Sequence, residues 1–245
     1  MSNWSTQDRQ YHIQCKEGDV GRYVLLPGDP GRVPKIAAYL DNAKPVAQNR
    51  EYNVFTGEID GVPVSVCSTG IGCPSTAIAV EELKRCGADT FIRVGTSGMM
   101  QPYMNKGDLV IATAAIRDEG TSQQYLPLAF PAVADPMVVS AFIRACKKHD
   151  VCYHAGVVHS KDSFYGEVEM ARMPMANQLE SRWKAWVAGG ALCSEMEAST
   201  LFVVSSFLRA RAGALMLAEA HEGMDNLCRI AVAGIQELIQ QDVHV

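Results

Sequence analysis

Three arginines stand beside segments of the sequence where a guanidinium could bind an anion. Arg32 ends the glycine-rich run Pro27–Arg32, and Arg50 precedes a predicted strand. Arg93 lies inside the apolar run Phe91–Val94, just before further glycines. An unpaired charge in a buried strand is very costly, so Arg93 needs an anionic partner. On the sequence alone that partner is equally a bound ligand or a local Asp or Glu. Taken singly, Arg32 and Arg50 are better explained as solvated surface arginines.

A pair of glutamates forms the second unusual feature. Glu195 and Glu197 flank Met196 directly after an apolar stretch, at the predicted start of a helix. The helix dipole favours a carboxylate there, and such a carboxylate can accept two hydrogen bonds from ribose hydroxyls. If the motif stood alone, the better explanation would be that both glutamates only cap the helix.

Weaker candidates are found elsewhere in the chain. Phe164 follows a predicted strand and could offer a ring face to a base, although an aromatic residue there more often belongs to the core. His12 lies in an N-terminal arm, where a lone histidine is usually structural or solvated. The segment Gly70–Ser75 faintly resembles a dinucleotide-binding turn. Asp89, however, precedes the next strand, whereas the ribose-binding acid of that motif should follow it, so we exclude NAD binding.

The elements that must position these residues alternate along the chain. This order predicts right-handed crossovers and a mainly parallel or mixed central sheet, covered by helices on both faces. No linker or repeat divides the chain, so we expect a single α/β domain over residues 1–245. Ligands in such sheets bind beyond the carboxyl ends of the strands. The predicted strands are 23–26, 52–58, 62–67, 90–94, 108–115, 151–159 and 214–217, and the predicted helices are 33–40, 75–86, 137–149, 195–209 and 222–241.

The composition excludes several classes of protein. The 245 residues are 48% hydrophobic and 20% charged with a net charge of −5, which excludes disorder, collagen-like repeats and a coiled coil. An acidic balance argues against a nucleic-acid surface but not against a small anion. We expect neither a signal peptide at residues 1–9 nor a membrane span. The eight cysteines include no CxxC pair, which predicts free thiols in a reducing cytoplasm and no zinc site.

Taken together, the motifs resemble the nucleoside phosphorylase family, and within it the bacterial uridine phosphorylases. The matching segments run in the family's order from about His12 to Arg211. They are 27–33, 66–72 with 74–76, 92–98, 128–135, 162–165 and 195–197. The resemblance implies the nucleoside phosphorylase fold and the reversible phosphorolysis of uridine to uracil and ribose 1-phosphate. It implies no organic cofactor and no catalytic metal, because phosphate is a co-substrate.

The resemblance also implies a role for each matching residue. The residues implied to bind phosphate are Gly28, Arg32, Arg93 and Thr96, with Arg50 lent by a partner subunit. Those implied to bind ribose are Met196 and Glu197, with His12 lent by a partner subunit. Those implied to lie against the base are Ser97, Gly98, Phe164 and Glu195. Three of these residues would be catalytic, namely Arg93, Thr96 and Glu197.

The shared site implies self-association, at least into a dimer, and it leaves a dimer and a hexamer both open. The implied partners are a nucleoside and inorganic phosphate, without nucleic acid or membrane. In some uridine phosphorylases a structural potassium ion lies between subunits. The positions that bind it match Glu51, Ile71 and Ser75 of this chain.

Two features depart from the family pattern. The family has a Gln and an Arg that hydrogen-bond the uracil edge, and alignment without gaps places Val168 and Met170 there. Glu167 and Arg172 are candidates to replace them. The family also has a flap over the base, and about a dozen of its residues have no counterpart between Ala218 and Glu219. We therefore expect a gap at this point, with Ala218 and Glu219 not bonded to one another.

Three other functions stay open. A purine nucleoside phosphorylase of the same fold is the first, because Val168 and Met170 remove the uracil-binding pair. A hydrolytic nucleosidase is less favoured, since attack by water gives no reason for three arginines to converge. A non-catalytic nucleoside-binding protein would be favoured if the arginines paired internally and left no anion site. The choice between uridine and thymidine also stays open.

Overall fold

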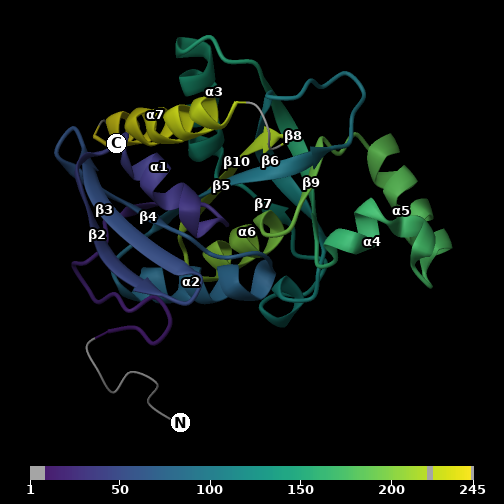
Figure 1. Ribbon diagram of the computed structural model, residues 1–245, viewed down its shortest axis with the longest axis horizontal. Helices are drawn as coiled ribbons and strands as arrows, with labels where there is room; N and C mark the ends of the chain where they lie inside the picture. The colour runs from purple at the N-terminus through teal and green to yellow at the C-terminus, as the bar shows by residue number, and fades with distance from the viewer. Residues whose placement is uncertain (1–8, 220–222, 244–245) are drawn as a thin grey trace.

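The computed structural model describes residues 9–219 and 223–243, and it is built on one ten-stranded mixed sheet (Figure 1). The order in the sheet is β10-β6-β8-β9-β5-β1-β4-β3-β2, with β7 paired to β6. The strands are β1 (Tyr23–Leu26), β2 (Asp41–Asn49), β3 (Tyr52–Ile59), β4 (Val62–Cys67), β5 (Thr90–Met99), β6 (Leu109–Asp118), β7 (Ala132–Val133), β8 (Tyr153–Lys161), β9 (Cys193–Glu195) and β10 (Arg211–Ala218).

One part of the sheet closes on itself. Strand β10 pairs in parallel with β5 and antiparallel with β6, and β9 bridges β8 and β5. Strands β5, β10, β6, β8 and β9 therefore form a closed ring, while β1, β4, β3 and β2 extend from it. This closure brings the carboxyl ends of β1, β5 and β8 to the same side as β9, which is where a ligand site is expected.

Helices cover both faces of the sheet (Figure 1). Helices α1, α3 and α7 pack together on one face, and α2 and α6 pack together on the other. Helices α4 and α5 lie at one end of the molecule, beyond β8 and β9. The helices are α1 (Val33–Ala37), α2 (Cys73–Arg85), α3 (Pro136–Lys148), α4 (Phe164–Val168), α5 (Ala176–Ala188), α6 (Ala198–Phe207) and α7 (Met224–Asp242).

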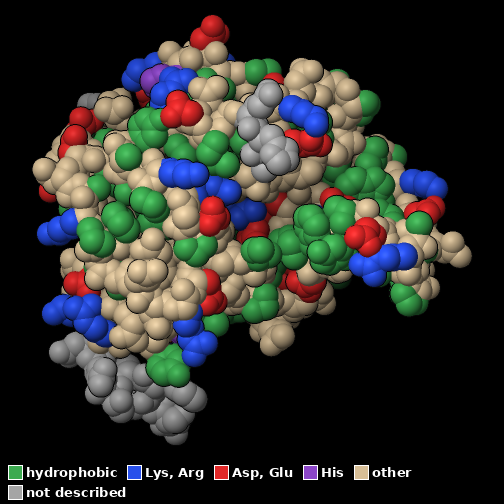
Figure 2. Space-filling view, viewed as in Figure 1, with side chains coloured by type: hydrophobic (Ala, Val, Ile, Leu, Met, Phe, Trp, Pro, Cys, Tyr) green, Lys and Arg blue, Asp and Glu red, His purple; other side chains and the backbone are tan. Residues whose placement is uncertain are grey.

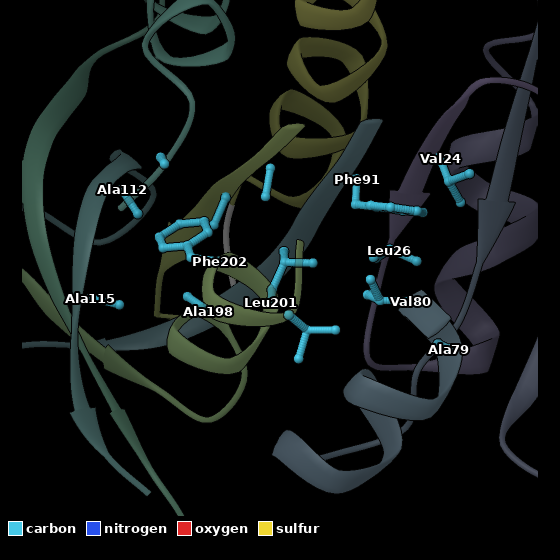
Figure 3. Close-up of a cluster of buried hydrophobic side chains, with 14 of the residues drawn as sticks. Val24, Leu26, Ala79, Val80, Phe91, Ala112, Ala115, Ala198, Leu201 and Phe202 are labelled. Carbon is cyan, nitrogen blue, oxygen red and sulfur yellow. The ribbon is translucent and has the colours of Figure 1, made fainter. Parts of the chain in front are cut away.

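The double cover follows from the side chains of the strands, which alternate between two hydrophobic cores. Val24 and Leu26 pack under α2 and α6, in the core drawn in Figure 3. Tyr23 and Leu25 enter the other core, with α1, α3 and α7. In β5, Phe91 belongs to the first core, so Arg93, two residues on, points to that same face. The expected α/β architecture with a mixed sheet is confirmed.

The structure corrects three local predictions. Gly95–Gly98 does not leave the strand, because β10 pairs with β5 as far as Ser97 and β9 pairs with β5 at Gly98 and Met99. Glu195 does not begin a helix; it ends β9, and α6 begins at Ala198. Strand β2 was not predicted, since it is polar, exposed and contains Pro45. Such a sequence is tolerated at the edge of a sheet.

The expected gap after Ala218 is wrong. Glu219 follows Ala218 directly in the full sequence, and its N–H donates a 3.0 Å hydrogen bond to the Ser97 carbonyl. The Ala218 N–H in turn donates to the Asp108 carbonyl at 2.9 Å. The two residues are therefore consecutive, and this chain has no flap of the family's length here. The predicted start of the last helix, Glu222, lies outside the described residues.

Within residues 9–219 and 223–243, no helix combines the length and hydropathy needed to cross a membrane. Each of the eight cysteines is a free thiol, and seven of them are buried.

Candidate active site

A cavity of about 910 Å³ opens at the carboxyl ends of the central strands. Figure 2 shows Lys or Arg and Asp or Glu side chains meeting in a hollow near the middle of one face, beside hydrophobic side chains. The structure brings ten of the predicted site residues to this cavity. They are Gly28, Arg32, Arg93, Thr96, Ser97, Gly98, Phe164, Glu195, Met196 and Glu197.

Arg93 is held between two carboxylates. Its Nε lies 2.7 Å from Glu195 Oε2 and its Nη2 lies 2.6 Å from Glu197 Oε2, with all three side chains at most 7% exposed. Burial alone would lower the pKa of Arg93, but Glu197 and Glu195 outweigh it and raise that pKa. The Arg93 charge is thus paired with two glutamates of its own chain, which is one of the two alternatives that the sequence left open.

The two glutamates have different roles. Glu195 accepts hydrogen bonds from the N–H groups of Glu197 and Ala198, so it caps α6 as well as pairing with Arg93. Glu197 accepts a 2.6 Å hydrogen bond from the Gly72 N–H. Burial, reinforced by the charge of Glu195, raises the pKa of Glu197 even though Arg93 opposes the shift. The Glu197 side chain, unlike that of Glu195, therefore does not cap α6.

Gly95 makes room for the Arg93 guanidinium. A Cβ added at Gly95 would lie 2.6 Å from Arg93 Nη2 and 2.7 Å from its Cζ. No side chain fits at that separation, so the arginine can fold back over its own strand only because position 95 is a glycine. Of the glycines that follow Arg93 in β5, Gly95 is therefore required by the close approach of the guanidinium.

Arg32 supplies a second buried guanidinium on the same side of the cavity. It is 9% exposed, and its Nη1 donates a 3.0 Å hydrogen bond to the Val94 carbonyl. Burial, followed by the charge of nearby Arg93, lowers the pKa of Arg32. In the described part of the chain no carboxylate lies within ion-pair distance of Arg32. Arg32 thus adds a guanidinium without a carboxylate partner in that part of the chain, beside the group formed by Arg93, Glu195 and Glu197, and this arrangement can bind a small anion.

Lys161 is a cavity residue that sequence reasoning missed. It ends β8, is 7% exposed, and donates a 2.8 Å hydrogen bond to Ser194 Oγ. Its Nζ also lies 2.8 Å from Glu167 Oε2. A lysine at the end of an apolar strand is the same signal that singled out Arg93. Of the two candidates to replace Val168 and Met170, Glu167 lines the cavity, whereas Arg172 pairs with Glu169 outside it.

A buried histidine supports this end of the cavity. His159 Nδ1 lies 2.9 Å from Ser194 Oγ, and its Nε2 lies 3.1 Å from Asp118 Oδ2. The Trp186 ring lies against the imidazole, with the ring centroids 4.1 Å apart. Burial, and then the Lys161 charge, lower the pKa of His159 to about 4. The histidine is therefore neutral at pH 7 and holds Ser194 in place.

His12 and Arg50 do not line the cavity of their own chain. The backbone N–H of His12 and its Nδ1 both contact the Glu82 carboxylate, at 3.0 and 2.7 Å. The Asn49 amide donates to the His12 carbonyl at 2.7 Å, and exposed Arg50 follows Asn49 directly. The two predicted site residues therefore lie together on another part of the surface.

Of the positions predicted to hold potassium, Ile71 also lines the cavity, while Glu51 and Ser75 lie beside it. The Glu51 side chain approaches Gly70 so closely that a Cβ there would be 2.9 Å from Glu51 Cγ and 3.7 Å from Ser75 Oγ. Ser75 Oγ donates to the Ile71 carbonyl at 3.3 Å. A carboxylate, a hydroxyl and a carbonyl are thus close together at the surface, and all three are oxygen donors of the kind that hard cations prefer.

Comparison with known proteins identifies the family of the chain. Residues 22–238 match the family model described as the phosphorylase superfamily. The chain is 47% identical to a uridine phosphorylase of Treponema pallidum, covering 96% of both chains. It is 42% identical to a guanosine phosphorylase of Halorubrum lacusprofundi, covering 84% of this chain and 81% of that one. A crystal structure of uridine phosphorylase from Vibrio fischeri superposes with a TM-score of 0.87 at 36% identity, over 96% of this chain and 99% of the other.

Replacing Gly95 by alanine should disturb the anion site without unfolding the protein. The new Cβ displaces the Arg93 guanidinium, and we expect the affinity for inorganic phosphate to fall at least tenfold by calorimetry, which corresponds to about 1.4 kcal/mol. Gly98→Ala is the matched control, because its Cβ approaches only Glu167 Oε1, at 3.4 Å. Equal phosphate affinities for Gly95→Ala and the wild type would contradict this assignment.

Acid should destabilise the protein in part through His159. Its pKa of about 4 lies below the ordinary 6.5, so the unfolded chain takes up the proton first and stability falls as the pH falls from 6.5 toward 4. Between pH 7 and pH 5 the expected cost is about 2 kcal/mol. Urea unfolding at both pH values should show a smaller loss in His159→Gln than in the wild type. The same loss in both proteins would remove His159 from this effect.

Proposed function

The chain belongs to the phosphorylase superfamily, and we propose that it catalyses the reversible phosphorolysis of uridine to uracil and ribose 1-phosphate. The carrying observation is the pair of buried guanidiniums, Arg32 and Arg93, beside a carboxylate that can bind ribose, Glu197. The Treponema and Vibrio proteins that it resembles are both named uridine phosphorylase. In this account the enzyme is a pentosyltransferase of nucleoside salvage.

The charges in the cavity suit the reaction. Breaking an N-glycosidic bond builds positive charge on the sugar, which an anionic phosphate on one face stabilises. Arg32, Arg93, Gly28 and Thr96 hold that phosphate in position, and positioning accounts for much of the rate increase. Each charge-assisted hydrogen bond contributes about 1.5–3 kcal/mol, and millimolar phosphate affinity needs only about 4 kcal/mol. Two arginines are therefore sufficient for the resting site.

The cavity also has the length of the reacting complex. It crosses four adjacent strands in the order β1, β5, β9 and β8. Neighbouring strands lie about 4.8 Å apart, so the three spacings span about 14 Å. Phosphate at the β1–β5 end, ribose against Met196 and Glu197, and the base toward Phe164 and β8 fit this distance. Ser97 and Gly98 form the wall beneath the base.

Glu197 acts on ribose by accepting hydrogen bonds from its hydroxyls. A carboxylate can accept two such bonds. The pKa of Glu197 is raised because the side chain is buried, and a bound sugar would keep it buried. When phosphate arrives, Arg93 exchanges part of its contact with Glu197 for the phosphate oxygens. Glu195 keeps its place through the α6 N–H groups and supports the site from below the base.

The non-catalytic and hydrolytic alternatives are less well supported. Arg93 pairs with two glutamates of its own chain, whereas the guanidinium of Arg32, beside it, donates only to the Val94 carbonyl among the described residues. The Arg32 charge is therefore still open to a bound anion. A hydrolase that uses water as nucleophile has no need for two buried arginines at the reacting face. We therefore retain the phosphorylase function.

A 6-oxopurine nucleoside is the second candidate substrate. Val168, which replaces a uracil-binding position of the family, lines the cavity and leaves an apolar wall. The Halorubrum relative is named guanosine phosphorylase. The cavity volume of about 910 Å³ also admits a purine nucleoside.

Self-association would complete the site. His12 and Arg50 lie together, away from the cavity of their own chain, as expected of residues lent to a partner subunit. Arg50 then adds a third guanidinium to phosphate and His12 adds a contact to ribose. Glu51, Ile71 and Ser75 fit a structural potassium ion on the same surface, which would hold the subunits together without entering the chemistry. Eight free thiols suit a reducing cytoplasm, where we place the enzyme.

An assay with and without phosphate tests the reaction. We expect uracil release from uridine only when phosphate is present, with ribose 1-phosphate as the second product. Arg93→Met should lower kcat/KM by at least about 100-fold, because a buried charge-assisted contact and its positioning are both lost. Release of uracil at an equal rate without phosphate would contradict the proposal.

Mixing two inactive variants tests the lent residues. One chain carries His12→Asn with Arg50→Met, and the other carries Arg93→Met. We expect co-expressed chains to recover activity, because an intact cavity from the first then meets intact His12 and Arg50 from the second. Each variant expressed alone is the control. Continued inactivity of a verified mixed oligomer would show that His12 and Arg50 act only in their own chain, and activity of the His12→Asn/Arg50→Met variant alone would show that they do not act at all.

A further inference from the structure

The end of the cavity opposite the arginines holds a second buried ion pair, formed by Lys161 and Glu167. Their side chains are 9% and 14% exposed, and Lys161 Nζ lies 2.8 Å from Glu167 Oε2. Lys161 is on β8 and Glu167 on α4, while Arg93 is on β5, with β9 between β5 and β8. The pair is therefore about two strand spacings, on the order of 10 Å, from the phosphate end.

Each partner keeps one hydrogen-bonding position free. Lys161 has three N–H donors, and two of them are used, by Glu167 and by Ser194 Oγ at 2.8 Å. Glu167 uses Oε2 for Lys161 and Ser194, while Oε1 has no partner in residues 9–219 and 223–243. Oε1 instead lies over Gly98 on the cavity wall, 3.4 Å from where a Cβ at Gly98 would be. A free acceptor thus lies beside a free donor.

Surrounding contacts hold this pair in place. Ser194 receives the Lys161 hydrogen bond and contacts Glu167, and neutral His159 fixes Ser194 from the other side. Gly166 is locked to Ser163 by a 2.9 Å hydrogen bond at the start of α4, directly before Glu167. Binding energy is therefore not spent on ordering the two side chains when a ligand arrives.

An acceptor next to a donor matches one type of base edge. A lactam edge, in which a ring N–H adjoins a carbonyl, offers a donor to Glu167 and an acceptor to Lys161. Uracil, thymine, hypoxanthine and guanine all have such an edge. Cytosine and adenine have the reverse pattern, a ring nitrogen lone pair beside an amino group. In the same orientation the lone pair would face the Glu167 carboxylate and the amino N–H would face the Lys161 ammonium, and both contacts are repulsive.

We propose that Lys161 and Glu167 are the base-recognition residues, and that they select nucleosides whose base presents a lactam edge. This inference rests on the proposed function, because the base must lie at this end when phosphate lies at Arg32 and Arg93. It explains how the chain recognises a base with Val168 and Met170 in place of the family's pair. It also places a cation beside the carbonyl that gains negative charge as the base departs, so Lys161 stabilises the leaving group.

Four nucleosides and two variants test the selection. The wild type should split uridine and inosine with kcat/KM at least about 100-fold above cytidine and adenosine, as expected of a site whose polar groups are left unpaired by the wrong base. Glu167→Gln should narrow the uridine-to-cytidine ratio at least tenfold, because an amide can turn its N–H₂ toward the cytosine ring nitrogen. Lys161→Met should lower kcat/KM for uridine by about 10- to 100-fold, the range for a hydrogen bond to a charged group.

Two controls separate recognition from folding. Lys161→Met with Glu167→Gln removes both charges together, so no uncompensated carboxylate stays buried, and it should lose selectivity while keeping phosphate affinity. Lys184→Met with Glu180→Gln changes an exposed pair of the same types on α5, with side chains 77% and 49% exposed, and should keep wild-type selectivity.

Binding of free uracil and cytosine, measured by calorimetry, tests the pair without catalysis. Tighter binding of uracil that disappears in the double variant supports the inference even if no nucleoside is split, in which case only the proposed function fails. Conversely, phosphate-dependent uridine cleavage with unchanged selectivity in Glu167→Gln and Lys161→Met would overturn the inference and leave the proposed function standing.

Discussion

The buried contact between Arg93 and the two glutamates is the constraint on which the rest of the site depends. A guanidinium inside a strand of a doubly covered sheet must be neutralised, and removing one partner of such a buried group costs several kcal/mol. The surrounding structure is arranged to satisfy it. Gly95 leaves space for the guanidinium, and β9 places Glu195 beside it. The N–H groups of Glu197 and Ala198, at the start of α6, hold the Glu195 carboxylate. In the proposed reaction Glu197 is the partner that gives up part of its contact, so that the same arginine can bind an anion.

The site has two centres of charge, about two strand spacings, on the order of 10 Å, apart. Arg32 and Arg93 lie at the β1–β5 end, and Lys161 with Glu167 lies at the β8–α4 end. The closed ring of strands makes this possible, because β9 joins β5 to β8 and brings residues from distant parts of the sequence to one edge. The acidic net charge of −5 is no obstacle, since a few placed cations determine the local potential. In the proposed reaction the cation at the base end stabilises the departing base.

Much of the fold and half of the site could be predicted from the sequence. The alternation of apolar strands and helices indicated the mixed sheet, and the position of Arg93 in an apolar run indicated a buried anion partner. The identity of that partner could not be derived, because Glu195 is about a hundred residues away and meets Arg93 only through antiparallel pairing of β5 and β9. Lys161 was missed although it carries the same signal. Glu167 could be predicted only as a candidate, because alignment without gaps places Val168 and Met170 at the base-binding positions. The continuity of Ala218 and Glu219 does not follow from the family's length, because this chain is shorter at that point.

In the proposed reaction Arg93 keeps its contact with Glu195 and exchanges part of its contact with Glu197 for a phosphate. A crystal structure of the enzyme with inorganic phosphate and uracil tests it most directly. The account predicts a phosphate in contact with Arg32, Arg93 and Thr96, with the Arg93–Glu195 contact kept and the Arg93–Glu197 contact lengthened. A phosphate bound elsewhere, with Arg93 still held by both glutamates, would contradict it.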